Sequence, residues 1–179
     1  PNILTISLHQ DNLFPQGRGK ASDTGGASAP GANINIPLSP GSGSGAYRYA
    51  FDSVVMPAIE QFCPDMLFVA SGFDAAAMDP VGHMMLSSED YRYMTERLLQ
   101  VADKCCGGRI VATHEGGYSP GYVPYCGLAV IEALSGKSAK IADPFLDYIA
   151  NYGAQELQPH QKTQIDAVAS AQVLKQAAE

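Results

Sequence analysis

Two short apolar runs, each followed at once by glycine and a polar side chain, constrain the fold of this chain more than any other feature. Residues 66–70 lead through Ser71-Gly-Phe into Asp74, and residues 109–115 lead through two glycines into Tyr118. A run without polar alternation predicts a strand covered on both faces, as in a parallel sheet between helix layers. Such sheets bind their ligands beyond the carboxyl ends of the strands. We therefore expect Asp74 and Tyr118 to share a site.

The rest of the chain alternates between strand-like and helix-like segments. Ser87 with Asp90 is typical of a capping box, and Pro57 should bend the helix that contains it. This order predicts an α/β fold of three layers, α/β/α, with a mainly parallel sheet in one domain. Further strands are expected over residues 2–9 and 33–36, and helices over 46–62, 87–106, 120–134, 144–151 and 160–178.

The stretch over residues 10–32 is irregular and dense in Gly, Ser, Asp and Pro. A long segment without regular structure inside a compact domain is usually functional. We expect it to form a rim or lid over the strand ends.

The composition excludes several classes of protein. With 46% hydrophobic and 16% charged residues over 179 positions, the chain is typical of a globular protein. The formal net charge of −7 speaks against broad nucleic-acid binding, which requires clustered Lys and Arg. No apolar run approaches the roughly 20 residues that span a bilayer, so no membrane partner is expected. The four cysteines form no C-x-x-C pair, which favours a reduced, cytoplasmic setting.

Single motifs leave the chemistry open. Gly41-x-Gly43-x-x-Ala46 loosely matches a dinucleotide-binding loop, but prolines at 37 and 40 disrupt the required strand-to-helix turn and favour a structural hinge. The four histidines are too scattered for a metal-binding motif on one helix. Taken singly, a loop-capping role for Asp74 and a packing role for Tyr118 are the simpler explanations.

Three segments, taken together in this order, resemble the zinc-dependent deacetylase family of histone deacetylases, acetylpolyamine amidohydrolases and bacterial class II-like amidohydrolases. The likeness runs from about residue 2 to residue 136 and is greatest to the bacterial class II-like members. Each motif is short, but their order and spacing are specific. The segments are Ser7-Leu-His-Gln-Asp-Asn-Leu-Phe-Pro15, Ser71-Gly-Phe-Asp-Ala75 with Asp79-Pro80, and Glu115-Gly-Gly-Tyr118.

The resemblance implies an arginase/deacetylase-like fold and a zinc-dependent amidohydrolase that removes N-acyl groups from lysine side chains or polyamines. It implies that Asp74 is one of three zinc ligands and that Tyr118 is the catalytic tyrosine. The zinc would activate a water and polarise the amide, and the phenol would donate to the developing oxyanion. Gly116 and Gly117 would let the substrate approach the backbone closely.

Further positions match secondary features of that family. Phe14 matches an aromatic residue that lines the substrate channel, and Val81 falls where relatives carry a larger Leu or Met. Ser7 and the Leu8 carbonyl match a structural potassium site. Specificity does not transfer, because the smaller Val81 would widen the channel mouth.

The family's Asp-x-His zinc-binding pair and its tandem catalytic histidines have no match in this sequence. We therefore expect residues 1–179 to be the C-terminal part of a single catalytic domain, inactive without an N-terminal half. No export signal opens the chain, and its start at Pro1 indicates that the true N-terminus is not here. The alternative is a non-catalytic module of the same fold that binds an acyl or cationic ligand. The natural substrate stays open, as does assembly into a homo-oligomer.

Overall fold

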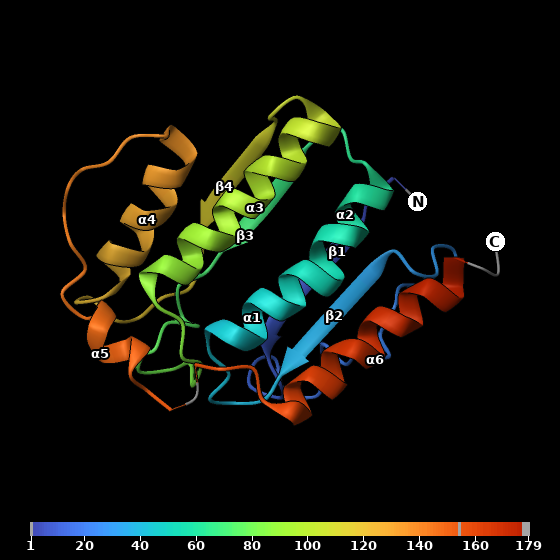
Figure 1. Ribbon diagram of the computed structural model, residues 1–179. Coiled ribbons are helices and arrows are strands. Elements are labelled where there is room, and N and C mark those ends of the chain that lie inside the picture. The colour runs from blue at the N-terminus through green and yellow to red at the C-terminus, as the bar shows by residue number, and fades with distance from the viewer. Residues whose placement is uncertain (1, 154, 177–179) are drawn as a thin grey trace.

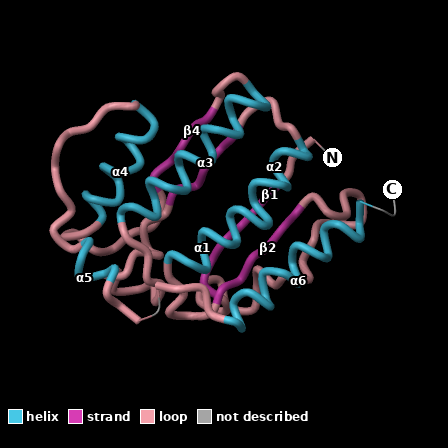
Figure 2. Tube along the Cα trace, in the orientation of Figure 1, coloured by secondary structure: helices cyan, strands magenta, loops and turns pink. Residues whose placement is uncertain are grey.

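The computed structural model describes residues 2–153 and 155–176, in which helices cover one side of a set of parallel strands (Figure 1). Figure 2, in the same orientation, separates the helices from the strands by colour. The strands are β1 (Thr5–Gln10), β2 (Asn33–Leu38), β3 (Leu67–Ser71) and β4 (Ile110–His114). The helices are α1 (Ser44–Ala50), the π-helical η1 (Phe51–Val55), α2 (Met56–Phe62), α3 (Ser88–Cys106), α4 (Val123–Ser135), α5 (Leu146–Ala150) and α6 (Pro159–Gln176).

The strands form two parallel pairs. β1 pairs with β2 in a register that sets Leu8 opposite Ile36, and β3 pairs with β4 with Val69 opposite Ala112. Parallel pairs require a crossover between their strands, and α3 supplies it between β3 and β4. The α/β class and the parallel pairing are therefore as predicted.

The prediction that both faces of the strand after Met66 are covered is wrong for this chain. Phe68 in β3 is 75% exposed, and Val111 in β4 is also exposed, because the helices pack on the opposite face only. β2 does have both faces buried, from Ile34 to Leu38. There the irregular segment before it packs against the strand, with Asn35 donating to the Lys20 carbonyl at 3.1 Å.

The helix expected over residues 46–62 consists of α1, η1 and α2, which follow one another without a break. Its irregular part is the π-helical turn η1, which lies just before Pro57, where a bend is expected. The π-helical turn ends two residues before Pro57. Proline has no N–H to donate, and its ring clashes with the carbonyl four residues earlier, so the preceding turn widens. The helix ends at Cys63, which adopts a left-handed conformation.

The start and end of α3 follow the predicted signals. Ser87 and Asp90 form a complete capping box, and Gly107 ends the helix in a left-handed conformation. The buried face of α3 carries Tyr91 and Val101. Local side-chain chemistry thus determines both ends of this helix.

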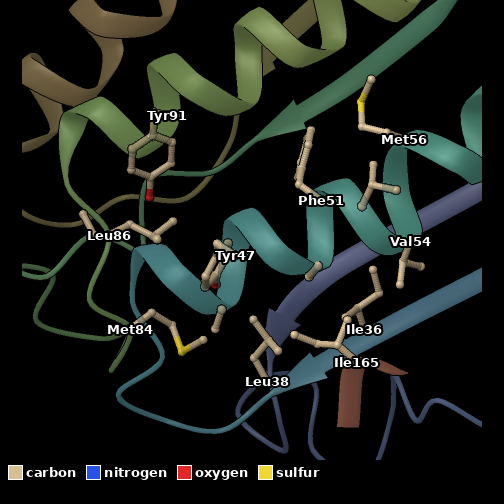
Figure 3. Packing of buried hydrophobic residues seen from close by; sticks show 14 of the residues in the cluster. Ile36, Leu38, Tyr47, Phe51, Val54, Met56, Met84, Leu86, Tyr91 and Ile165 are labelled. Carbon is tan, nitrogen blue, oxygen red and sulfur yellow. The ribbon is translucent and has the colours of Figure 1, made fainter. Parts of the chain in front are cut away.

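One hydrophobic core joins the strands to the helices. Figure 3 shows Tyr47 of α1 together with Phe51 and Val54 of η1 pointing into it. Ile36 of β2 and Ile165 of α6 meet them there, and both are fully buried. The buried apolar side chains of the described residues thus form one contiguous cluster.

Some element boundaries differ from expectation. β2 continues through Pro37, because β2 is an edge strand whose outer side needs no backbone donor. The last helix begins at Pro159. Residues 177–178, which are expected to belong to it, and the side chain of Val173 lie outside what the structure describes. None of the helices in the described residues is both long enough and apolar enough to cross a bilayer.

A buried carboxylate ties α1 to the start of α3. Asp90 is 1% exposed and accepts hydrogen bonds from the Ser87 amide at 2.9 Å and the Ser44 hydroxyl at 2.6 Å. Arg48 adds two charge-assisted bonds to the other carboxylate oxygen, at 3.1 and 3.0 Å. Such a carboxylate is costly to leave unpaired, so these four groups act as one unit.

We predict that Asp90→Asn lowers the free energy of unfolding by about 3 kcal/mol, the lower end for a broken buried ion pair, because the half-exposed Arg48 can regain water. Urea unfolding of the complete protein measures it. Asp52→Asn, which removes the exposed partner of Arg97, is the control and should cost less than about 1 kcal/mol. Equal losses in the two variants would contradict the role given to Asp90.

Candidate functional site

The carboxylate of Asp74 lies where the segments after β3 and β4 meet. A Cβ added at Gly72 would lie 2.9 Å from its Oδ1, and one added at Gly116 would lie 2.8 Å from its Oδ2. Real Cβ atoms do not approach oxygen so closely, so both glycines leave room for this carboxylate. Asp74 of the first segment therefore packs directly on the backbone of the second.

Backbone hydrogen bonds extend the β3–β4 pairing into this region. The Glu115 amide donates to the Ser71 carbonyl at 3.1 Å, and the Phe73 amide donates to the Gly116 carbonyl at 2.7 Å. Gly117 follows with a φ of +132°, and a Cβ there would lie 2.9 Å from that of Phe73. The two loops thus leave the sheet as one joined structure, and glycine is required at position 117.

The carboxylate of Asp79 holds the loop that carries Tyr118. Its Oδ2 accepts from the Tyr118 amide at 2.7 Å, while its Oδ1 accepts from the amides of Val81 and Gly82 at 2.8 and 2.9 Å. Tyr118 itself is 55% exposed, so its phenol is accessible at this edge. Asp79 belongs to the second of the three family segments, but the sequence assigns no role to it. In an Asx-turn the side chain of an Asp accepts a hydrogen bond from the backbone amide two residues later. Asp79 followed by Pro80 is a usual sequence signal for this turn, and here the amide belongs to Val81.

A cluster of aromatic side chains packs beneath Asp74. Phe73 is buried and contacts Tyr91 edge-on, with ring centroids 5.2 Å apart, and His114 at 5.1 Å. Burial, followed by the negative charge of Asp74, raises the pKa of the Tyr47 hydroxyl. Burial likewise raises the pKa of Tyr91, with smaller contributions that include Asp74 and Asp79. Both phenols therefore stay neutral at physiological pH.

A contact between the strand pairs completes this edge. Gln10, the last residue of β1, accepts from the His83 amide at 2.8 Å, and its side-chain nitrogen lies 3.3 Å from His83 Nδ1. His83 belongs to the same loop as Asp79. The carboxyl end of β1 and the loop after β3 are therefore in direct contact, which the sequence did not indicate.

The structure brings the segment that carries Asp74 against the segment of Gly116 and Gly117 that leads into Tyr118, and the functional roles of these residues stay predictions. Val81 is in the turn bound by Asp79 and is 49% exposed. Phe14, in the loop after β1, is 90% exposed. Their assignment to a substrate channel stays a prediction.

Ser7 and Leu8 lie on β1, away from the Asp74 carboxylate in sequence but in the strand whose end reaches His83. His9 Nε2 lies 3.1 Å from the Gly19 carbonyl, and its Nδ1 lies 2.8 Å from Ser7 Oγ. In a neutral imidazole the carbonyl contact requires the proton on Nε2, so Nδ1 accepts from the Ser7 hydroxyl. The Ser7 oxygen then keeps its lone pairs.

No group of three His, Cys, Asp or Glu side chains among residues 2–153 and 155–176 could hold a metal ion. Asp74 has the chemistry of a single metal ligand, a half-buried carboxylate at an open edge. The described residues therefore fit one position in a zinc coordination sphere and not a complete site.

Comparison with known proteins identifies the family. Residues 1–134 match the histone deacetylase domain, and the chain belongs to this family. It is 50% identical over 148 residues to a histone deacetylase-like amidohydrolase of Pseudomonas aeruginosa, a match that covers 83% of this chain and 39% of the relative. A probable deacetylase of Archaeoglobus fulgidus is 37% identical over 135 residues, covering 75% of this chain and 37% of the relative.

Solved structures give the same result for the fold. The histone deacetylase Clr3 superimposes with a TM-score of 0.79 at 32% identity, over 96% of this chain and 27% of that one. The HDA15 HD domain superimposes with a TM-score of 0.76 at 30% identity, over 95% and 44%. The arginase/deacetylase-like α/β fold is thereby confirmed, and the chain spans less than half the length of these relatives.

We predict that Asp79→Asn loosens the Tyr118 loop. An amide has one acceptor oxygen and an NH₂ group that cannot accept from the Tyr118 amide, so about 1.5–3 kcal/mol of stability is lost. Hydrogen exchange at the amides of Val81, Gly82 and Tyr118 should accelerate. Asp103→Asn, at an exposed position of α3, is the control. Unchanged exchange at all three amides of the Asp79 variant would contradict the assignment.

Proposed function

We propose that the protein containing this chain is a zinc-dependent amidohydrolase that removes acyl groups from lysine side chains or polyamines. The observation that carries the proposal is the packing of the Asp74 carboxylate against Gly116, two residues before an exposed Tyr118. A carboxylate and a phenol thereby reach the same edge of the sheet, as the sequence motifs of the family require. Family membership supports a deacetylase or amidohydrolase, while the zinc and the substrate class are part of the proposal.

Asp74 is the metal ligand that this chain would contribute. When bound, a catalytic zinc supplies Lewis acidity toward the amide carbonyl and acidifies a water. Asp74 could supply one oxygen ligand, because the glycines at 72 and 116 leave room for its carboxylate. The other ligands and the general base would come from residues outside those described here.

Tyr118 is the proposed oxyanion donor. Its backbone is fixed by the bond to Asp79 and by the constrained turn at Gly117, so the side chain extends from a well-defined backbone position. Its exposure leaves the hydroxyl free to meet a substrate. A donor positioned in advance stabilises the developing negative charge without reorganisation during the reaction.

The substrate channel is proposed from exposed apolar side chains near the same edge. Phe14 and Val81 would pack on the linear stem of an acyl-lysine-like or acylpolyamine substrate, and Gly116 and Gly117 would admit its amide close to the backbone. The formal net charge of −7 on this chain is compatible with a cationic substrate.

We also propose that the chain is the C-terminal part of a single catalytic domain. Among the described residues β1 pairs only with β2, and β3 only with β4, so β1 and β3 each keep one edge without a strand partner. These are the inner two strands in Figure 1. A strand from the N-terminal part would pair with both edges and join the two pairs into one sheet. On this proposal the chain alone is inactive.

Three further assignments belong to this proposal. Ser7 and the Leu8 carbonyl would hold a structural potassium ion, since the Ser7 oxygen keeps its lone pairs when its hydrogen goes to His9. The four cysteines are free, which agrees with a reducing, cytoplasmic location. A homo-oligomer is compatible with the chain but has no specific support.

The competing hypothesis is a binding module that holds an acyl or cationic ligand at the same edge without hydrolysing it. It predicts no requirement for zinc, so metal analysis of the complete protein separates the two. The partial coordination offered by Asp74 and the exposed Tyr118 favour the enzyme.

We predict that Tyr118→Phe in the complete protein lowers deacetylation of an acetyl-lysine reporter about 10²–10³-fold, the effect of losing one oxyanion donor. Zinc content and the thermal midpoint should not change, since the phenol is exposed. Tyr148→Phe removes another exposed phenol, from α5, and should leave turnover unaltered. Wild-type turnover by the Tyr118 variant would end the assignment.

We predict that Asp74→Asn lowers zinc retention after dialysis, because a neutral amide is a poorer ligand than a carboxylate. Zinc per chain is measured by elemental analysis, with Asp103→Asn as the charge-matched control. A protein that keeps its full zinc content without the Asp74 carboxylate would show that this residue is not a ligand.

A further inference from the structure

A cavity of about 460 Å³ lies at the amino-terminal ends of β1 and β2, opposite the edge that carries Asp74. Its walls come from β2, from the end of α2, from α6 and from the irregular segment before β2. In Figure 1, α2 and α6 lie on either side of β2. The volume is within the usual range for small-molecule sites, and nothing in the proposed deacetylase chemistry uses it.

The lining of this cavity is neutral. Leu4, Ile34, Phe62 and Val168 provide apolar walls, and none of the described side chains that line it is ionisable. A charged ligand would lose its hydration here without gaining a counter-charge, which is costly. An uncharged, largely apolar molecule gains from the same surroundings.

One polar group at the cavity has no partner among the residues that the structure describes. Nε2 of Gln172 is buried and makes no hydrogen bond to any of them. The amides of Asn33 and Asn35, which also line the cavity, donate to the carbonyl of Asp23. A buried donor without an acceptor is destabilising, so the Gln172 amide marks the point where a ligand oxygen would be held.

We propose that this cavity binds a neutral, mainly apolar small molecule that presents a carbonyl or hydroxyl oxygen to Nε2 of Gln172. The bound molecule would bridge α2 and α6 across the end of β2. It would therefore stabilise the attachment of α6 to the sheet without touching Asp74 or Tyr118.

The test uses prodan, a neutral naphthalene ketone whose fluorescence shifts to the blue in apolar surroundings. The complete protein should bind it saturably with one site per chain. Ala58→Leu and Ala171→Leu each place a larger side chain into the cavity and should abolish binding. Ala167→Leu makes the same change one turn away in α6, outside the cavity lining, and should bind as the wild type does.

Gln172→Leu keeps the cavity apolar but removes the donor, so affinity should fall about 2- to 12-fold, the usual effect of one hydrogen bond. Circular dichroism and thermal unfolding establish that each variant is folded. With two independent filling variants, one that fails to fold leaves the other to decide.

Three results would overturn the proposal. One is the absence of saturable binding by the complete protein, which would mean that its own residues fill the cavity. Another is wild-type binding by a folded Ala58→Leu or Ala171→Leu variant. A third is wild-type affinity in a folded Gln172→Leu variant, which would show that the Gln172 side chain does not hold the ligand.

Discussion

The buried carboxylate of Asp90 is the interaction on which the rest of the arrangement depends. It caps α3 through Ser87 and ties that helix to α1 through Ser44 and Arg48. The start of α3 sets where the loop after β3 must end, and this loop carries Asp79. This polar network thus limits where the loop that ends at α3 can lie, because a buried carboxylate tolerates only the geometry that satisfies it.

The candidate site is assembled mainly by backbone contacts. Gly72 and Gly116 make room for the Asp74 carboxylate, and Asp79 accepts hydrogen bonds from three amides on two segments. The neutral, buried phenols of Tyr47 and Tyr91 lie beneath the candidate site. Rigid support of this kind suits a group that must act on a substrate in one orientation, because little ordering remains to be done when the substrate binds.

Features of the site and fold were predictable where local chemistry or sheet geometry decides them. Parallel strands end at a common edge, so the meeting of the segments that carry Asp74 and Tyr118 followed from two apolar runs. The capping box at Ser87 followed from side-chain spacing. The bond from Tyr118 to Asp79 was not predictable, since the two residues are 39 positions apart and no local rule connects them. Phe68 was expected to be buried because its run is apolar, but its cover is not among the described residues.

The open face of β3 and β4 has a practical consequence for anyone who produces these 179 residues as a separate polypeptide. Exposed aromatic and aliphatic side chains adjoin strand edges that have no strand partner among the described residues, a combination that invites pairing between copies and aggregation. If the chain is the C-terminal part of a larger domain, as proposed above, such a polypeptide would accumulate in inclusion bodies unless the rest of the domain were co-expressed with it. Solubility would then report on correct reassembly before any activity is assayed.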